Sequence, residues 1–494
     1  MSQILTALRK YAQEKPEQPA LTSTDLSLTY SQLNKCILSN GALLKEAGVA
    51  VVALAADNSP AWLCADLACI QAAITLVPVP HFFSPSQISH LLIDAGVDAL
   101  LTDHMDQLSA LLTQLSISFE ISEQTIAGLQ LLILHTERVS LPEKCAKITY
   151  TSGSTGEPKG VCLSLASMEQ VANSLAKTTQ AGPTDTHLAL LPYATLLENI
   201  GGGYVPLLVG ATIYAPGMAA VGMAGAAGLD LKQFVTALHN SAATTCIMIP
   251  QMLHGLLAAL TAGMEKPDKL RYIAVGGASV SPQLLAMAAT LALPVYEGYG
   301  LSEAASVVAV NAPGMKRPGS VGKILPHVAM SFAQDGEILV AGSLFSGYLG
   351  EPQLAPSAVW PTGDIGYLDD DGFLYLTGRK KHIFITAFGR NVSPEWVERE
   401  LSIEQGISQC CLFGEARAFN VAIIVARQGF DAESIVLAVA SANHRLPDYA
   451  RIHQWIIADE PFTVANGLWT GTGRPRRAQI EASYQLQINS LKES

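Results

Sequence analysis

The segment with the clearest chemistry spans residues 148–164 and reads ITYTSGSTGEPKGVCLS. Two β-rich apolar runs enclose a loop in which Gly153 and Gly156 free the backbone to turn successive N–H groups toward an anion. The other donors are the hydroxyls of Thr151, Ser152, Ser154 and Thr155 and the ammonium group of Lys159. The loop therefore predicts a polyphosphate site, with an ordinary polar turn as the less favoured alternative when the segment is taken alone.

The spacing of this loop excludes two common phosphate motifs. It contains neither the GxxxxGK[ST] pattern of a P-loop nor the GxGxxG pattern of a dinucleotide-binding turn. The chain also lacks the GxSxG elbow that exposes the nucleophile of many serine hydrolases. A nucleotide site of another type is therefore expected.

Three further motifs follow the loop: YGLSE at residues 299–303, TGD at 362–364 and GRKK at 378–381. In this order the set resembles the adenylate-forming (AMP-binding) superfamily, which contains acyl-CoA synthetases, adenylation domains of nonribosomal peptide synthetases and luciferases. The resemblance covers nearly the whole chain. It implies ATP- and Mg²⁺-dependent activation of a small carboxylic acid, here a medium- or long-chain fatty acid, as acyl-AMP, followed by transfer to coenzyme A or an acyl carrier protein.

The YGLSE motif carries family roles to individual residues. Tyr299 matches the ring that stacks near adenine, and Glu303 matches the magnesium ligand; Gly300 and Ser302 belong to the same nucleotide site. Ser302 replaces the family's threonine and keeps the hydroxyl group. A carboxylate such as that of Glu303 suits a hard cation that bridges phosphate oxygens.

Other positions complete the nucleotide site that the resemblance implies. Gly276, Gly277 and Ala278 resemble the small-residue loop along the adenine face. Asp364 matches the acid that accepts hydrogen bonds from the ribose, and Arg379 matches the basic residue that holds ribose and phosphates. Together with the loop at residues 151–159, these positions form the predicted nucleotide pocket.

The C-terminal part of the chain carries a predicted hinge. Lys381 matches the residue about which the small domain rotates between an adenylating and a thioester-forming pose. Gly389 matches the glycine beside the pantetheine arm of coenzyme A, although a plain turn glycine is an equal alternative. Ser393 and Pro394 are typical of a helix start. We therefore expect an N-terminal AMP- and acyl-binding domain over residues 1–380 and a mobile C-terminal lid over 381–494.

Three departures from the family pattern bear on the reaction. Arg474 stands where the family has the lysine that neutralises carboxylate and α-phosphate, so the adenylation step depends on a wider, planar cation. Thr195 stands where relatives often carry histidine or an aromatic residue at the acyl entrance, while Glu198 matches. The segment that fatty-acyl-AMP ligases insert before residue 362 is absent, which favours coenzyme A as the acceptor.

Composition and periodicity predict a layered α/β protein. The 494 residues are 49% hydrophobic and 15% charged, which is typical of a chain with several large cores. Residues 51–55 and 74–79 read as strands around a helix at 61–73, and such alternation predicts a large N-terminal α/β part, with a smaller α+β domain after it. The glycine-rich segment 217–228 reads as a loop, with close backbone packing near a ligand as the alternative.

Charge and hydropathy argue against two classes of binding partner, nucleic acids and membranes. A net charge of -12 disfavours nucleic-acid binding, and no apolar run is long enough to span a membrane. The first twenty residues lack a secretory signal pattern, so a cytoplasmic location is expected. The eight cysteines have no CxxC spacing, which argues against zinc and for reduced, buried thiols.

Two other functions stay open at this stage. A β-lactone synthetase on the same scaffold would capture the acyl-adenylate with the substrate's own hydroxyl group. A non-catalytic protein that binds a nucleotide or an acyl-adenylate would retain the pocket, with Arg474 as the sign of lost adenylation.

Overall fold

The computed structural model describes residues 2–151, 158–224, 228–278, 280–388, 390–470 and 473–491. Six of the predicted site residues lie outside these ranges: Ser152, Gly153, Ser154, Thr155, Gly156 and Gly389. Their assignments stay predictions.

An eight-stranded sheet, in the order β21-β9-β8-β4-β3-β5-β7-β6, organises the first part of the chain. Its strands are β3 (Val51–Ala55), β4 (Thr75–Pro78), β5 (Ala99–Thr102), β6 (Phe119–Ile126), β7 (Leu129–Leu134), β8 (Cys145–Thr151), β9 (Lys159–Ser164) and β21 (Gly347–Tyr348). Helices α1 (Gln3–Glu14), α2 (Tyr30–Glu46), α3 (Pro60–Ala72), α4 (Pro85–Asp94), α5 (Met105–Gln114) and α6 (Leu165–Thr178) accompany it.

The predicted strand–helix–strand unit at residues 51–79 is confirmed within two residues. Strand β3 is buried along four of its five residues, as expected for a parallel strand covered on both faces. Helix α3 begins after Ser59, whose side chain accepts a hydrogen bond from the Trp62 N–H, with Pro60 at its first position. Almost the whole helix is buried, which explains its apolar sequence.

A nine-stranded sheet follows, in the order β18-β17-β16-β15-β14-β10-β11-β1-β2. Its strands are β1 (Pro19–Thr22), β2 (Ser27–Thr29), β10 (Thr186–Leu188), β11 (Thr212–Tyr214), β14 (Thr245–Met248), β15 (Tyr272–Val275), β16 (Val295–Leu301), β17 (Ser306–Val310) and β18 (Lys323–Ile324). The helical segments are α7 (Leu196–Glu198), the π-helix η1 (Asn199–Tyr204), α8 (Val205–Val209), η2 (Met218–Val221), α9 (Leu231–Asn240), α10 (Pro250–Thr261), α11 (Pro282–Thr290) and η3 (Ser302–Ala304).

The two large sheets share one core. Leu54 on β3, Ile213 on β11 and Val307 on β17 belong to the same cluster of buried side chains as Trp62 on α3 and Met168 on α6. Helices α3 and α6 therefore lie between the sheets, while α9, α10 and α11 cover the other face of the nine-stranded sheet through a second cluster. This layered α/β arrangement confirms the predicted fold class.

The described part of the glycine-rich segment 217–228 consists mostly of short regular elements, where a loop was predicted. It holds the short helix η2 and the antiparallel pair of β12 (Met223–Ala224) and β13 (Gly228–Leu229). The described residues contain no helix long and apolar enough to cross a membrane. All eight cysteines are free.

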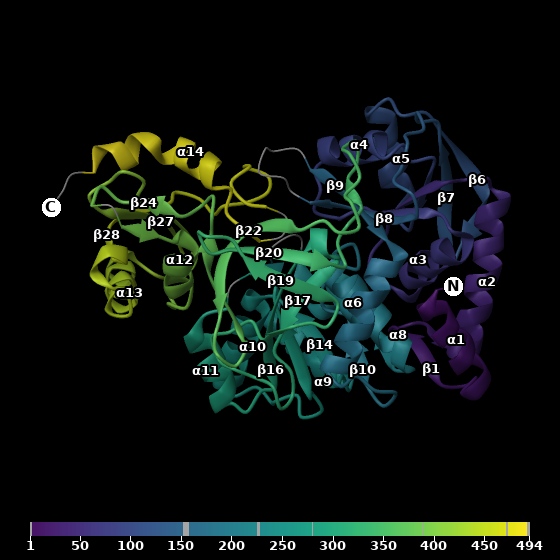
Figure 1. Ribbon diagram of the computed structural model, residues 1–494, viewed down its shortest axis with the longest axis horizontal. Helices are drawn as coiled ribbons and strands as arrows, with labels where there is room; N and C mark the ends of the chain where they lie inside the picture. The colour runs from purple at the N-terminus through teal and green to yellow at the C-terminus, as the bar shows by residue number, and fades with distance from the viewer. Residues whose placement is uncertain are drawn as a thin grey trace.

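A four-stranded sheet and a separate C-terminal domain complete the chain. The sheet contains β19 (Val328–Phe332), β20 (Glu337–Gly342), β22 (Trp360–Leu368) and β23 (Leu374–Arg379). The C-terminal elements are β24 (Phe384–Ile385), β25 (Asn391–Val392), α12 (Pro394–Ser402), β26 (Ile407–Phe413), β27 (Asn420–Ala426), α13 (Ala432–His444), η4 (Asp448–Ala450), β28 (Ile452–Ile457) and α14 (Arg477–Ser490). Figure 1 shows α12, α13 and α14 at the opposite end of the molecule from α1 and α2.

Candidate active site

A cavity of about 600 Å³ opens where the large sheets and the C-terminal domain meet. The residues of its wall include many that the motifs predict: Thr151, Lys159, Thr195, Gly276, Gly277, Tyr299, Gly300, Ser302, Glu303, Arg379 and Arg474. The wall does not include Ala278, Glu198, Asp364 or Lys381. Residues more than 300 positions apart in the chain thus face one space.

Strand β16 and the short helix η3 carry the YGLSE motif to the cavity. The pairing of β16 with β17 shifts register between Tyr299 and Gly300. A Cβ atom on Gly300 would lie 1.6 Å from the Ser306 carbonyl oxygen, so no other residue fits without moving the backbone. Glycine at this position is therefore a steric requirement of the motif.

Asp364 lies beside the cavity and orients two residues of its wall. The buried carboxylate accepts a hydrogen bond of 2.7 Å from the Tyr299 hydroxyl and forms an ion pair of 2.8 Å with Nε of Arg379. Asp364 and Arg379 are cross-strand partners in β22 and β23. Burial and the neighbouring carboxylate raise the pKa of Tyr299, which keeps its hydroxyl a hydrogen-bond donor.

Tyr348 on β21 connects the two predicted catalytic residues of the large domain. Its hydroxyl donates a hydrogen bond of 2.7 Å to Oε1 of Glu303, and Nζ of Lys159 lies 4.8 Å from the centre of its ring. Lys159 also forms an ion pair of 3.0 Å with Glu351. The sequence analysis missed Tyr348, because its strand pairs with β9, a segment that is distant in the chain.

Arg474 reaches the same cavity from the C-terminal domain. Its guanidinium group donates a hydrogen bond to the carbonyl oxygen of Gly277, a residue with a φ of +82° that favours glycine. Loss of water around the guanidinium and the nearby charge of Arg379 lower the pKa of Arg474. The cation predicted for adenylation therefore faces the loop predicted for adenine.

Lys381 and Ala278 are exposed and lie outside the wall. Lys381 occupies the turn that follows β23, where the chain enters the C-terminal domain. Partial burial and Arg379 lower its pKa, and Asp364 opposes this shift. The position is compatible with a hinge, which stays a prediction.

Thr195 and Glu198 occupy different sides of one segment. Thr195 precedes α7 and lines the cavity, and its hydroxyl donates a hydrogen bond of 2.6 Å to the Pro192 carbonyl oxygen. Glu198 is fully buried behind the wall, 2.9 Å from Nε2 of His187, and accepts a hydrogen bond from the Leu191 N–H. Burial raises the pKa of Glu198, and His187 opposes this shift. Glu198 thus does not face the cavity, but it holds His187 and Leu191, two residues of the wall, in place.

A second buried network, which the sequence analysis missed, holds the π-helix that follows. Nζ of Lys147 lies 2.9 Å from Oδ1 of Asp66 and from the Tyr204 hydroxyl, and it also donates to the Asn199 side chain. Asn199 and Tyr204, the first and last residues of the π-helix, each lie 2.9 Å from Oδ2 of Asp66. Burial lowers the pKa of Lys147, and Asp66 opposes this shift. Both ends of the π-helix are therefore fixed to one ion pair.

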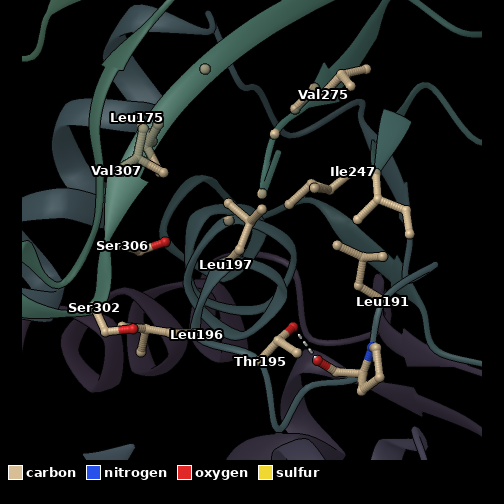
Figure 2. A pocket seen from close by; sticks show the side chains of 18 of the residues that line it. Leu175, Leu191, Thr195, Leu196, Leu197, Ile247, Val275, Ser302, Ser306 and Val307 are labelled. Carbon is tan, nitrogen blue, oxygen red and sulfur yellow. Dashed lines mark hydrogen bonds between the residues drawn. The ribbon is translucent and has the colours of Figure 1, made fainter. Parts of the chain in front are cut away.

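Away from the charged residues, the cavity wall becomes apolar. In Figure 2, Leu175 and Val307 lie on one side and Leu191, Ile247 and Val275 on the other, with Leu197 between them. The charged end and the apolar end belong to one continuous space. Such a cavity suits an amphipathic ligand whose polar group lies near Glu303 and Arg474.

Comparison with known proteins agrees with this geometry. The family model for AMP-binding enzymes matches residues 8–349, and that for the C-terminal domain of AMP-binding enzymes matches residues 381–494. A long-chain-fatty-acid–CoA ligase 6 from Rattus norvegicus is 24% identical over 606 aligned positions, which cover 97% of this chain and 83% of that protein.

Two solved structures share the fold. The anthranilate CoA ligase AuaEII, in complex with anthranoyl-AMP, aligns with a TM-score of 0.82 at 17% identity over 99% of this chain and 98% of its own. The o-succinylbenzoate coenzyme A synthetase of Bacillus subtilis, in complex with ATP and a magnesium ion, aligns with a TM-score of 0.76 at 21% identity over 96% of this chain and 99% of its own. At these identities the likeness concerns the fold alone.

Proposed function

Because the chain belongs to the AMP-binding enzyme family, we propose that it is an AMP-forming acid–thiol ligase. It activates a medium- or long-chain fatty acid with ATP to give acyl-AMP and pyrophosphate, and then transfers the acyl group to coenzyme A. One observation carries the proposal: a charged end with Glu303, Arg379 and Arg474 opens into an apolar chamber within a single cavity. The name of the rat relative, a long-chain-fatty-acid–CoA ligase, supports the same substrate class.

In this reaction the residues of the chain position the substrates and neutralise their charge. Tyr299, oriented by Asp364, lies where an adenine ring and its ribose would meet β16. Arg379 and Arg474 present cations to the α-phosphate and the attacking carboxylate, and charge that develops between them is stabilised by donors already in place. Lys159 lies beside Tyr348, where its ammonium group can neutralise charge on the leaving pyrophosphate.

The residues present fit magnesium held mainly by the nucleotide. Glu303 offers one carboxylate to the cavity, and the described residues contain no group of three or more His, Cys, Asp or Glu side chains that could hold a metal. Mg²⁺ commonly takes one or two carboxylates together with phosphate oxygens. When bound, the ion would neutralise phosphate charge, with Glu303 as its protein ligand.

Domain organisation and location form part of the proposal. We place the boundary between an AMP- and acyl-binding domain and a mobile lid at residues 380 and 381, and the C-terminal family match from residue 381 supports this division. The lid would rotate about Lys381, and Gly389 would then approach the pantetheine arm. A cytoplasmic location, where ATP and coenzyme A are available, is consistent with this activity.

Pyrophosphate release tests the proposal. Purified protein is assayed with ATP, Mg²⁺ and straight-chain acids of increasing length, each with and without coenzyme A, and Glu303→Gln serves as the matched variant. We expect acid-dependent release, a thioester only with coenzyme A, and a loss of at least about a hundredfold in Glu303→Gln, the scale for removal of one electrostatic group at a transition state.

The same assay separates the alternatives. A β-lactone from a 3-hydroxy acid without coenzyme A would identify a β-lactone synthetase. Nucleotide binding without any pyrophosphate release would identify a non-catalytic binding protein. Full activity in a folded Glu303→Gln variant would contradict the role of Glu303.

A further inference from the structure

The apolar part of the cavity follows one face of two neighbouring parallel strands. Thr245 and Ile247 on β14 pair with Tyr272 and Ala274 on β15, and all four line the cavity. Alternate residues of a strand point to the same face, so these side chains form a continuous floor. At about 3.3 Å per residue, the five steps from Gly276 to Arg271 correspond to roughly 16 Å. The floor is thus a groove that leads away from the nucleotide end.

Gly201 lies next to Ile247, at the side of this groove. It lines the cavity, and a Cβ atom built on it would lie 2.8 Å from Cδ1 of Ile247. Gly201 lies within the π-helix whose ends are fixed by the ion pair of Lys147 and Asp66. The wall therefore cannot retreat readily from a larger side chain at position 201.

Arg271 closes the far end of the groove. Its Nε donates a hydrogen bond of 2.6 Å to Asp185, and its terminal nitrogens donate bonds of 3.1 Å to the carbonyl oxygens of Thr179 and Gln180. The Arg271 side chain is 34% exposed, although it also lines the cavity. The cavity therefore reaches almost to the surface at this point, and one ion pair separates its end from solvent.

We propose that Gly201 and the Arg271–Asp185 pair determine which acyl chains this enzyme accepts. An unbranched chain lies along β14 and β15, passes Gly201 and places its methyl end at Arg271. Gly201 sets the width at the middle of the path, and Arg271 sets its length. The inference rests on the proposed function, because it assigns the apolar chamber to the acyl chain.

Two variants should move the chain-length preference in opposite directions. Gly201→Leu fills the middle of the path, and we expect kcat/KM for hexadecanoic acid to fall at least tenfold more than that for hexanoic acid. Arg271→Ala combined with Asp185→Ala removes the end wall without leaving a buried carboxylate unpaired, and we expect kcat/KM for icosanoic acid to rise at least threefold relative to hexadecanoic acid. The KM for ATP should stay unchanged in both variants.

Two further variants guard against misfolding and general effects. Gly201→Ala is a milder change that should shift the preference in the same direction as Gly201→Leu. Arg317→Ala removes another arginine with two carboxylate partners, Asp369 and Asp371, at a place outside the cavity wall, and it should leave the preference unchanged.

A binding measurement separates this inference from the proposed function. The same acids are tested for their effect on the melting temperature, since a ligand that binds only the folded state raises it. Suppose that the chain-length pattern of these shifts changes as described but no variant releases pyrophosphate. The assignment of the groove to the acyl chain is then supported, and the ligase proposal is wrong. If pyrophosphate is released but the length preference is the same in all variants, the ligase proposal stands and this inference is wrong.

Discussion

The two ends of the cavity use charged residues in different ways. At the nucleotide end, the Lys159 and Arg379 side chains are 47% and 36% exposed, and each pairs with a carboxylate at the edge of the cavity. Beneath the acyl end, the side chains of Lys147 and Asp66 are 1% and 0% exposed. Exposed charges can exchange their partners for the atoms of a ligand, whereas buried charges cannot and therefore fix the backbone.

The largest expected effect is a loss of stability when the buried network of Lys147 and Asp66 is broken. Lys147→Met leaves the Asp66 carboxylate without its ion-pair partner, and removal of one partner of a buried pair costs about 3–5 kcal/mol. We expect this decrease in the free energy of unfolding, measured by urea denaturation at pH 7. The double variant Lys147→Met/Asp66→Leu should recover part of it, because no buried charge then remains. A decrease below 1 kcal/mol in the single variant would show that Asp66 is solvated.

The second prediction concerns the cation at the nucleotide end. Arg474→Ala should slow acyl-adenylate formation by a factor that corresponds to about 2–4 kcal/mol, the scale for loss of one preorganised donor. Thioester formation from supplied acyl-adenylate should change far less, because the proposed rotation of the lid carries Arg474 away from the α-phosphate before that step. Stopped-flow measurement of each half-reaction distinguishes the two effects.

Two companion variants sharpen this result. Arg476→Ala removes a cation that does not line the cavity and should leave both steps unchanged. With Arg474→Lys, faster adenylation would mean that the natural arginine restrains the step, and slower adenylation would mean that the pocket fits the planar guanidinium. Equal rates in wild type and Arg474→Ala would make Arg474 a surface cation.

A third prediction uses Glu297, which is buried on β16 beneath the predicted adenine loop. Burial raises the pKa of Glu297 to about 7, with smaller opposing effects from the Val280 N–H and Arg399. A raised carboxyl pKa means that the folded state binds the proton more tightly than the unfolded state. The contribution to stability is therefore complete below the unfolded pKa and is lost as the pH rises through the folded pKa.

The Glu297→Gln variant lacks this titration. Wild type should lose up to roughly 3 kcal/mol of unfolding free energy relative to this variant between pH 4.5 and pH 8, at 1.36 kcal/mol per pKa unit. Urea denaturation at several pH values measures the difference. Parallel curves for the two proteins would mean that Glu297 titrates normally.

The smallest expected effect is at the exposed pair of Lys159 and Glu351. Glu351→Ala should change the unfolding free energy by less than about 1 kcal/mol, because both side chains are half exposed. The KM for ATP should not rise, since Lys159 keeps its charge. Lys159→Ala is the matched variant, and it should raise the KM for ATP. A rise in Glu351→Ala as well would place Glu351 in the nucleotide site.

Local features of the fold could be predicted from the sequence because short-range chemistry determines them. Residues 51–55 form a strand, and Ser393 and Pro394 begin α12. Each of these signals lies within a few neighbouring residues, so no tertiary contact is needed to recognise it.

The motif residues of the site could also be named from the sequence, since a phosphate loop, a carboxylate and two arginines have recognisable types and order. The residues that contact them in the folded protein could not be named in this way. Asp66 is visible in the sequence only as a charge that interrupts an apolar run, and Lys147 only as a charge in a strand. Their pairing, and that of Tyr348 with Glu303, joins segments that are distant in the chain.

Residue types and their local patterns were enough to predict the layered α/β class, several secondary-structure elements and the chemical types at the nucleotide end. Packing between distant segments places Glu198 behind the wall, joins Lys147 and Asp66 to the π-helix and ends the groove at Arg271. Such features depend on packing because burial and the low dielectric constant around a charge are set by the other segments that contact it. A residue's type and its neighbours in the chain do not contain that information.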